Sequence, residues 1–166
     1  MAAACGDSST GGASRRAVKL RLIVVGRGAS ELADFEARFV QRLQPFTSCS
    51  VIELPDGKGR QPAQRKQQEA ASILGKAGKG FVLFDERGRQ MSSIQWADWF
   101  GSQQGDAQLD FVIGGADGVA DEVRAAAAAT WGLSQLTLPH QLVRVVALEQ
   151  FYRAFTILRG HPYHRP

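Results

Sequence analysis

The residue types best suited to chemistry gather at the end of the chain. All three histidines, His140, His161 and His164, lie between Leu136 and Arg165, and this segment also carries most of the net charge of +4. Imidazole can take up or release a proton near neutral pH, and arginine can hold a negative charge. His161 and His164 are three residues apart and could meet a metal ion, but no third ligand is evident, so a metal site is disfavoured. The pattern indicates a basic tail with titratable groups and does not by itself name a reaction.

A second set of candidates follows apolar runs that are typical of buried strands. Phe84-Asp85 ends one run, Gly114-Gly115 follows another, and residues 136–140 close a third. Ligands of open parallel sheets bind beyond the carboxyl ends of the strands. Paired glycines leave room for a ligand to approach the backbone, although the same pair can simply form a tight turn. These strand ends predict a pocket lined largely by backbone.

Motifs of other enzyme classes are incomplete. Gly26-Arg27-Gly28 follows a strand as a dinucleotide fingerprint does, but Glu31 stands where the third glycine belongs. No strand end offers a Walker lysine, a Ser-His-Asp order or a glutamate-rich metal cluster. A dinucleotide-dependent oxidoreductase is therefore disfavoured.

Alternating strands and helices must position these residues. We predict strands at 18–25, 49–54, 80–85, 109–113 and 133–138, a turn at 86–89, and helices at 30–43, 62–76, 92–100, 119–130 and 140–158. Such alternation predicts an α/β fold with a mostly parallel sheet and helices on both faces. In the first helix, Leu32, Phe35, Phe39 and Leu43 are expected to face the core, with Ser30 as the N-cap.

Length and composition fit one globular domain at residues 18–166. The chain has 166 residues, and no apolar run approaches the length of a membrane span. Residues 1–17 are rich in Ala, Gly and Ser and predict a disordered extension, or alternatively an organelle-targeting segment. Cys5 and Cys49 are too few for a disulfide framework, which favours a reducing compartment. We expect a cytoplasmic protein, or one of a plastid or mitochondrion if residues 1–17 target it.

The predicted helix 140–158 has more apolar surface than one sheet can cover. One stripe consists of Leu142, Val146, Ala154 and Leu158, and a second of Val145, Leu148, Tyr152 and Phe155. A helix covered on one side needs a single stripe about 100° wide. Two stripes predict burial against the sheet and against a second partner.

Five segments of the chain resemble the RlmH family, ribosomal RNA large-subunit pseudouridine methyltransferases of the SPOUT superfamily. They are KLRLIVVG, FDERGRQMSS, DFVIGGADG, LTLPHQLVRVVALEQFYRAF and RGHPYHR, and they follow one another in family order between Val18 and Arg165. The resemblance implies S-adenosylmethionine as methyl donor, a C-terminal trefoil knot and a homodimer. The implied substrate is ribosomal RNA in the large subunit or the assembled ribosome, and no metal or membrane is implied.

The resemblance also assigns roles to residues. The implied cofactor pocket consists of Phe84, Gly114, Gly115, Ser134, Gln135, Leu136, Thr137, Leu138 and Pro139. The family's acceptor is ring nitrogen 3 of a pseudouridine, which must lose its proton to attack the methyl group. His164 and Arg165 are candidates for the base or for a stabilising cation, Arg144 is a second cation, and Tyr163 can stack on a base.

Two alternatives accompany this interpretation. Arg144 and Arg153 can instead be structural residues that pair with Glu149 in the helix or across a dimer. The whole protein can instead be a non-catalytic RNA-binding or ribosome-assembly protein with the same fold. A preserved donor pocket and a complete Tyr163-His164-Arg165 tail favour the enzyme, because a protein that only binds RNA does not need them.

Overall fold

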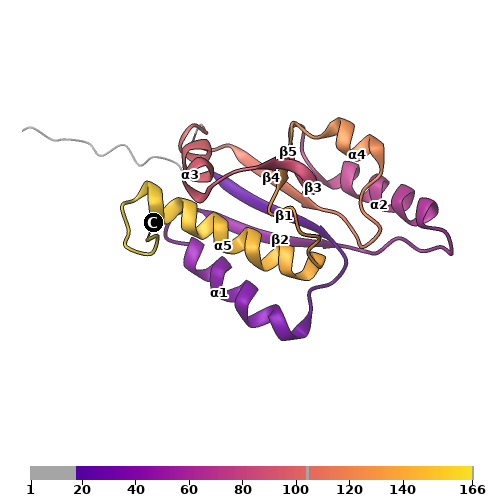
Figure 1. Cartoon of the computed structure of the whole chain (residues 1–166), viewed down its shortest axis with the longest axis horizontal. Helices are drawn as coiled ribbons and strands as arrows, with labels where there is room; N and C mark the ends of the chain where they lie inside the picture. The colour runs from indigo at the N-terminus through magenta and orange to yellow at the C-terminus, as the bar shows by residue number, and fades with distance from the viewer. Residues whose placement is uncertain (1–17, 104, 166) are drawn as a thin grey trace, which may run out of the picture.

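The computed structural model, which describes residues 18–103 and 105–165, contains one parallel sheet between two layers of helices (Figure 1). The strands are β1 (Lys19–Val25), β2 (Ser48–Leu54), β3 (Val82–Gln90), β4 (Gln108–Ile113) and β5 (Ala129–Gly132), in the order β2-β1-β4-β3-β5. The helices are η1 (Ser30–Leu32), α1 (Ala33–Leu43), α2 (Pro62–Lys76), α3 (Ser93–Gly101), α4 (Asp121–Ala126) and α5 (His140–Leu158). Every strand pair is parallel, so the predicted α/β class is confirmed. The trefoil knot stays a prediction, and the predicted extension at 1–17 lies outside the described residues.

Each face of the sheet carries its own core. Helices α1, α3 and α5 cover one face, where Phe39, Trp96 and Phe151 belong to one apolar cluster with Phe111 of β4. Helices α2 and α4 cover the other face through residues such as Ile73. Parallel strands buried on both faces require continuous apolar sequence, and this explains the runs in β1 and β4. No helix of the described residues is both long and apolar enough to cross a membrane.

The predicted strand at 133–138 is wrong. The edge strand is β5 (Ala129–Gly132), and residues 133–139 form a loop. The alanine-rich helix predicted to reach Thr130 ends at Ala126, because the Ala128 N–H donates to Phe81 O at 2.9 Å and draws the chain into the sheet beside β3. Long-range pairing here overrides the local helix propensity of alanine.

Strand β3 is longer than predicted and contains an outward bulge. Phe84 and Arg89 both pair with Trp131 of β5, so residues 85–88 leave the ladder where a turn was expected. A Cβ on Gly88 would collide with the backbone of Trp131, so only glycine allows β3 to rejoin β5 after the bulge.

Two predicted features of the first helix are wrong. Ser30 does not cap α1 with its side chain, because it begins the short helix η1. Phe35 is 48% exposed, and Glu36 is buried in its place. By contrast, Ser92 caps α3 as predicted, accepting from the Gln95 N–H at 3.2 Å in a capping box.

Helix α5 matches its predicted bounds, and its two stripes differ in burial. Leu148 and Tyr152 are buried inside the subunit, whereas Leu142 and Val146 are exposed. The second stripe is thus covered by the sheet and by α1 and α3. The exposed pair at 142 and 146 leaves part of the helix open to a partner.

Candidate functional site

A cavity of about 360 Å³ opens at the carboxyl ends of β3, β4 and β5. Its wall combines apolar side chains such as Phe84 and Ile113 with the glycine pair at 114–115 and the loop after β5. The cavity is within the size range of small-molecule sites, which are mostly apolar with a few convergent polar groups. It therefore lies where an open parallel sheet is expected to bind a ligand.

Seven of the nine predicted cofactor residues line this cavity: Phe84, Gly114, Gly115, Ser134, Leu136, Thr137 and Leu138. Gln135 and Pro139 belong to the same loop but do not line the cavity wall. The loop backbone is shaped locally, since the Leu136 N–H donates to Ser134 Oγ at 2.9 Å. An irregular loop leaves backbone N–H and C=O groups free for a ligand, which a strand in a ladder would not.

Neighbouring side chains leave little room for a side chain at Gly114 and Gly115. A Cβ on Gly114 would collide with Val119, and a Cβ on Gly115 would lie 2.8 Å from the carboxylate of Glu69. Glu69 is buried and accepts a hydrogen bond from the Gly57 N–H at 2.9 Å. Packing behind the wall therefore gives the pair a structural reason to be small, beside the ligand and the tight turn that the sequence left open.

The bulge of β3 brings charge to the cavity. Asp85, Glu86 and Arg87 all line it, and Arg124 Nε donates to Asp85 Oδ2 at 3.0 Å. Across the opening, Thr137 Oγ1 donates to Glu86 Oε2 at 3.2 Å. The bulge and the loop after β5 are thereby linked, so a ligand would be held between two connected segments.

A second ion pair supports the loop after β4. Asp117 lines the cavity, and Arg65 Nε donates to its Oδ2 at 2.6 Å. The hydrogen bond from Arg65 holds the pKa of Asp117 below its ordinary value. Arg65 of α2 is thus tied to Asp117 and supports the loop that forms this part of the wall.

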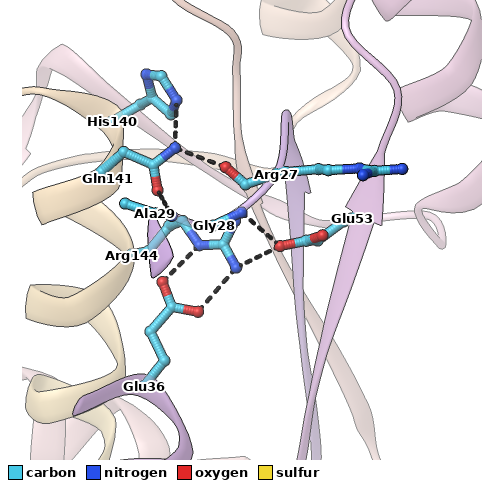
Figure 2. A network of polar contacts seen from close by, with 8 residues as sticks. All are labelled: Arg27, Gly28, Ala29, Glu36, Glu53, His140, Gln141 and Arg144. Atoms are coloured by element: carbon cyan, nitrogen blue, oxygen red, sulfur yellow. Dashed lines mark hydrogen bonds and ion pairs between the residues drawn. The ribbon is translucent and has the colours of Figure 1, made fainter. Parts of the chain in front are cut away.

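The structure places Arg144 in an internal ion pair instead of at the cavity (Figure 2). Its Nη2 donates to Glu36 Oε2 and to Glu53 Oε1, both at 2.8 Å, and its Nε lies 2.7 Å from Glu36 Oε1. The side chain is 2% exposed. Glu53 also accepts from the Gly28 N–H at 2.7 Å, so the network joins α5, α1, β2 and the loop after β1. These contacts favour a structural role, with Glu36 and Glu53 as partners in place of the predicted Glu149.

The C-terminal tail folds back onto the last turns of α5. The Tyr163 hydroxyl donates to Glu149 Oε1 at 3.0 Å, and the guanidinium of Arg153 lies 4.9 Å from the Tyr163 ring centre. Burial and the Glu149 carboxylate raise the pKa of Tyr163, which keeps its phenol protonated as a donor. His164 Nδ1 faces Arg153 Nη1 at 3.4 Å, and Arg165 is exposed. Arg153 does pair with Glu149, as one alternative expected.

The sequence reasoning missed several residues of the cavity wall. Val143, from the first turn of α5, and Lys66 of α2 both line it, whereas His140 belongs to the segment 136–140 that the sequence had already singled out. Val143 lies three residues after His140 on the predicted helix, so its position was a signal that could have found it. Lys66 comes from a helix distant in sequence, and no local pattern marks it. The described residues hold no group of three or more His, Cys, Asp or Glu side chains suited to a metal ion.

Comparisons with known proteins agree with this geometry. The family model described as "Predicted SPOUT methyltransferase" matches residues 18–164. A protein of Xanthobacter autotrophicus named "Ribosomal RNA large subunit methyltransferase H" is 43% identical over 159 residues, covering 89% of this chain and 99% of that protein. A protein of the same name from Gloeobacter violaceus is 36% identical over 150 residues, with the same coverage of both chains. This chain therefore belongs to the SPOUT methyltransferase family.

A solved structure supports the fold alone. A probable methylase family protein from Haemophilus influenzae has a TM-score of 0.53 to this chain at 13% identity, covering 89% of this chain and 70% of that one. The family match makes the protein a methyltransferase, and the cavity at the carboxyl ends of β3, β4 and β5 is its candidate active site.

Proposed function

We propose that the protein transfers a methyl group from S-adenosylmethionine to ring nitrogen 3 of a pseudouridine in large-subunit ribosomal RNA. The observation that carries the proposal is the cavity, because most of the residues that the family resemblance assigns to the donor line one continuous wall. The names of the bacterial relatives support ribosomal RNA as the substrate.

The residues of the cavity fit this methyl donor. Phe84, Leu136 and Leu138 provide apolar surface for an adenine ring, and the backbone around Gly115 and the loop after β5 can read polar edges. Carboxylates at Asp85 and Glu86 suit a ligand with an ammonium and a sulfonium charge. When bound, S-adenosylmethionine supplies an electrophilic methyl group, and the protein mainly has to align the acceptor in line with it.

The tail residues are proposed to act on the cavity of a second subunit. Tyr163 is held against α5 at Glu149 and Arg153, whereas α5 touches its own cavity through His140 and Val143. Arg153 lies ten residues after Val143, which corresponds to a rise of about 15 Å along the helix. A tail bound at that end is therefore remote from the cavity of its own chain, and a homodimer would supply the missing groups. The exposed Leu142 and Val146 offer apolar surface for that contact.

A binding experiment tests the donor site. Calorimetry with S-adenosylmethionine should show binding, and calorimetry with NADH should show none. Thr137→Trp is a suitable variant, because Thr137 is exposed and lines the cavity, so the larger ring should block the ligand without unfolding the chain. Absence of binding to the wild type would favour the alternative, a non-catalytic RNA-binding or ribosome-assembly protein.

Mass spectrometry of ribosomal RNA tests the reaction itself. RNA from cells lacking this gene should lose one methylated pseudouridine, and the purified protein should restore it. A mixing experiment then tests the shared site: Thr137→Trp and a chain lacking residues 163–166 should each be inactive alone. Mixed and allowed to exchange subunits, they should recover activity, because one chain supplies an intact cavity and the other an intact tail. No recovery in proven mixed dimers would contradict the shared site.

A further inference from the structure

The start of α5 joins the cavity to the loop after β1 through Gln141 (Figure 2). Gln141 Oε1 accepts from the Ala29 N–H at 2.9 Å, and Gln141 Nε2 donates to Arg27 O at 2.6 Å. A backbone N–H can only donate and a backbone carbonyl can only accept. The two contacts therefore fix which end of the Gln141 amide is oxygen and which is nitrogen.

The second N–H of that amide determines the state of His140. Gln141 Nε2 lies 3.0 Å from His140 Nε2, and an amide nitrogen has hydrogens to donate but no lone pair to accept. The His140 Nε2 must consequently be the acceptor, which leaves the ring proton on Nδ1. His140 is also part of the cavity wall. Its Nε2 is bonded to Gln141, and its Nδ1 has no hydrogen-bond partner among the described residues, so Nδ1 is the ring nitrogen that can meet a ligand.

We infer that Gln141 is a positioning residue that holds His140 as the Nδ1–H tautomer, so that His140 presents a hydrogen-bond donor, and not a base, to the ligands of the cavity. This inference rests on the proposed function only for the identity of those ligands. The partner chemistry is an oxygen that carries or gains negative charge. It can belong to the carboxylate of the methyl donor or to a carbonyl of the target base, where charge accumulates as the ring nitrogen loses its proton.

The other two histidines provide an internal contrast. His161 Nδ1 accepts from the Tyr163 N–H at 3.2 Å, and His164 Nδ1 faces the donor-only guanidinium of Arg153 at 3.4 Å. Both rings therefore carry their proton on Nε2 when neutral. One protein thus contains one histidine of the Nδ1–H type and two of the opposite type.

Nitrogen-15 NMR of the full chain tests this assignment directly, because the chemical shifts of the two ring nitrogens distinguish the tautomers. The chain has three histidines, and the spectrum of His140→Asn identifies the signal of His140 by its absence. The wild type should show protonated Nδ1 at His140 and protonated Nε2 at His161 and His164. Gln141→Met removes the amide that donates to His140 Nε2, so the preference for protonated Nδ1 should be lost in that variant. Protonated Nε2 at His140 in the wild type, or an unchanged His140 signal in Gln141→Met, would overturn the inference.

Kinetics separates a donor from a base. The amide nitrogen of Asn occupies a position similar to that of histidine Nδ1, so His140→Asn should keep activity within about tenfold of wild type, whereas His140→Ala should lose about 100-fold. A loss in the affinity for S-adenosylmethionine assigns the oxygen to the methyl donor, and a loss in turnover alone assigns it to the base. His140→Asn as slow as His140→Ala would refute the donor role. The NMR result stands independently of methyl transfer, so it remains informative if the wild type proves inactive on RNA.

Discussion

Substitution of Arg144 by methionine distinguishes a structural residue from a catalytic cation. The side chains of Arg144 and Glu36 are 2% and 11% exposed, so the variant leaves a buried carboxylate without its partner. Removing one member of such a pair costs about 3–5 kcal/mol. Glu53 adds little to this cost, because its side chain is 40% exposed and water can replace the guanidinium. With a denaturant slope of about 2 kcal/mol per molar urea, the unfolding midpoint should fall by about 1.5–2.5 M.

Equilibrium urea unfolding of wild type, Arg144→Met, Glu36→Gln and the double variant measures this coupling. The double variant should recover about 1–2 kcal/mol relative to the sum of the single variants, because it no longer buries an unpaired charge. Affinity for S-adenosylmethionine, measured well below the unfolding midpoint, should change little. An unchanged midpoint together with lost methyl transfer would refute this reasoning and return Arg144 to the list of catalytic candidates.

Three further outcomes are expected. Gly115→Ala should lower the free energy of unfolding by about 1–3 kcal/mol in a thermal melt, because the added carbon lies 2.8 Å from the Glu69 carboxylate. Adding Glu69→Ala to the same chain should recover part of that loss, and a Gly115→Ala variant as stable as wild type would contradict this packing. Burial alone would raise the pKa of Asp110, but the hydrogen bonds from Arg21 hold this pKa below the ordinary aspartate value. The ion pair therefore stabilises the fold fully above the ordinary aspartate pKa, and this stabilisation is lost as the pH falls through the lowered pKa of Asp110. In a plot of the unfolding midpoint against pH, Asp110→Asn should flatten the decline on the acid side. Burial raises the pKa of the Cys49 thiol to about 12, so iodoacetamide at pH 8 should modify Cys49 at least tenfold more slowly in the native protein than in urea, and equal rates would count against that burial.

Local signals explain which elements could be predicted from the sequence. Helix α5 was predicted with its observed bounds, because Pro139 favours the start of a helix and Gly160, at φ +63°, takes up a conformation that ends one. Ser92 likewise marks the start of α3 through a capping interaction within four residues. Each of these signals depends only on neighbours in the chain.

The elements that were predicted wrongly depend on distant partners. Strand β5 exists because residues from 128 onward pair with β3, whose sequence lies more than forty residues earlier. The apolar run at 133–138 resembles a strand in isolation, yet no neighbouring strand is placed to receive it. In the same way Glu36 is buried because Arg144 of α5 forms an ion pair with it. The spacing of apolar residues in α1 cannot predict this contact with a distant helix.

The candidate site was predicted in part. The donor loop followed from the family resemblance, and most of its residues line the cavity. The position of the tail did not follow, because its contacts with Glu149 and Arg153 depend on how the chain turns after Gly160. The length of residues 161–166 allowed the tail to extend either to a strand-end pocket or to a neighbouring subunit, and the observed contacts hold it at the end of α5 away from its own cavity.

The bulge in β3 has a consequence for how this fold can change. Both ends of residues 85–88 are attached to the same residue of β5, Trp131, so the sheet is closed around the bulge as long as Gly88 is kept. A longer or shorter bulge would cost little in loop entropy, since that cost grows only slowly with length. Residues between Asp85 and Gly88 can therefore be inserted, deleted or exchanged during evolution or by directed selection while the strand register is retained. Because Glu86 and Arg87 are exposed and line the cavity, ligand preference can drift there independently of folding stability.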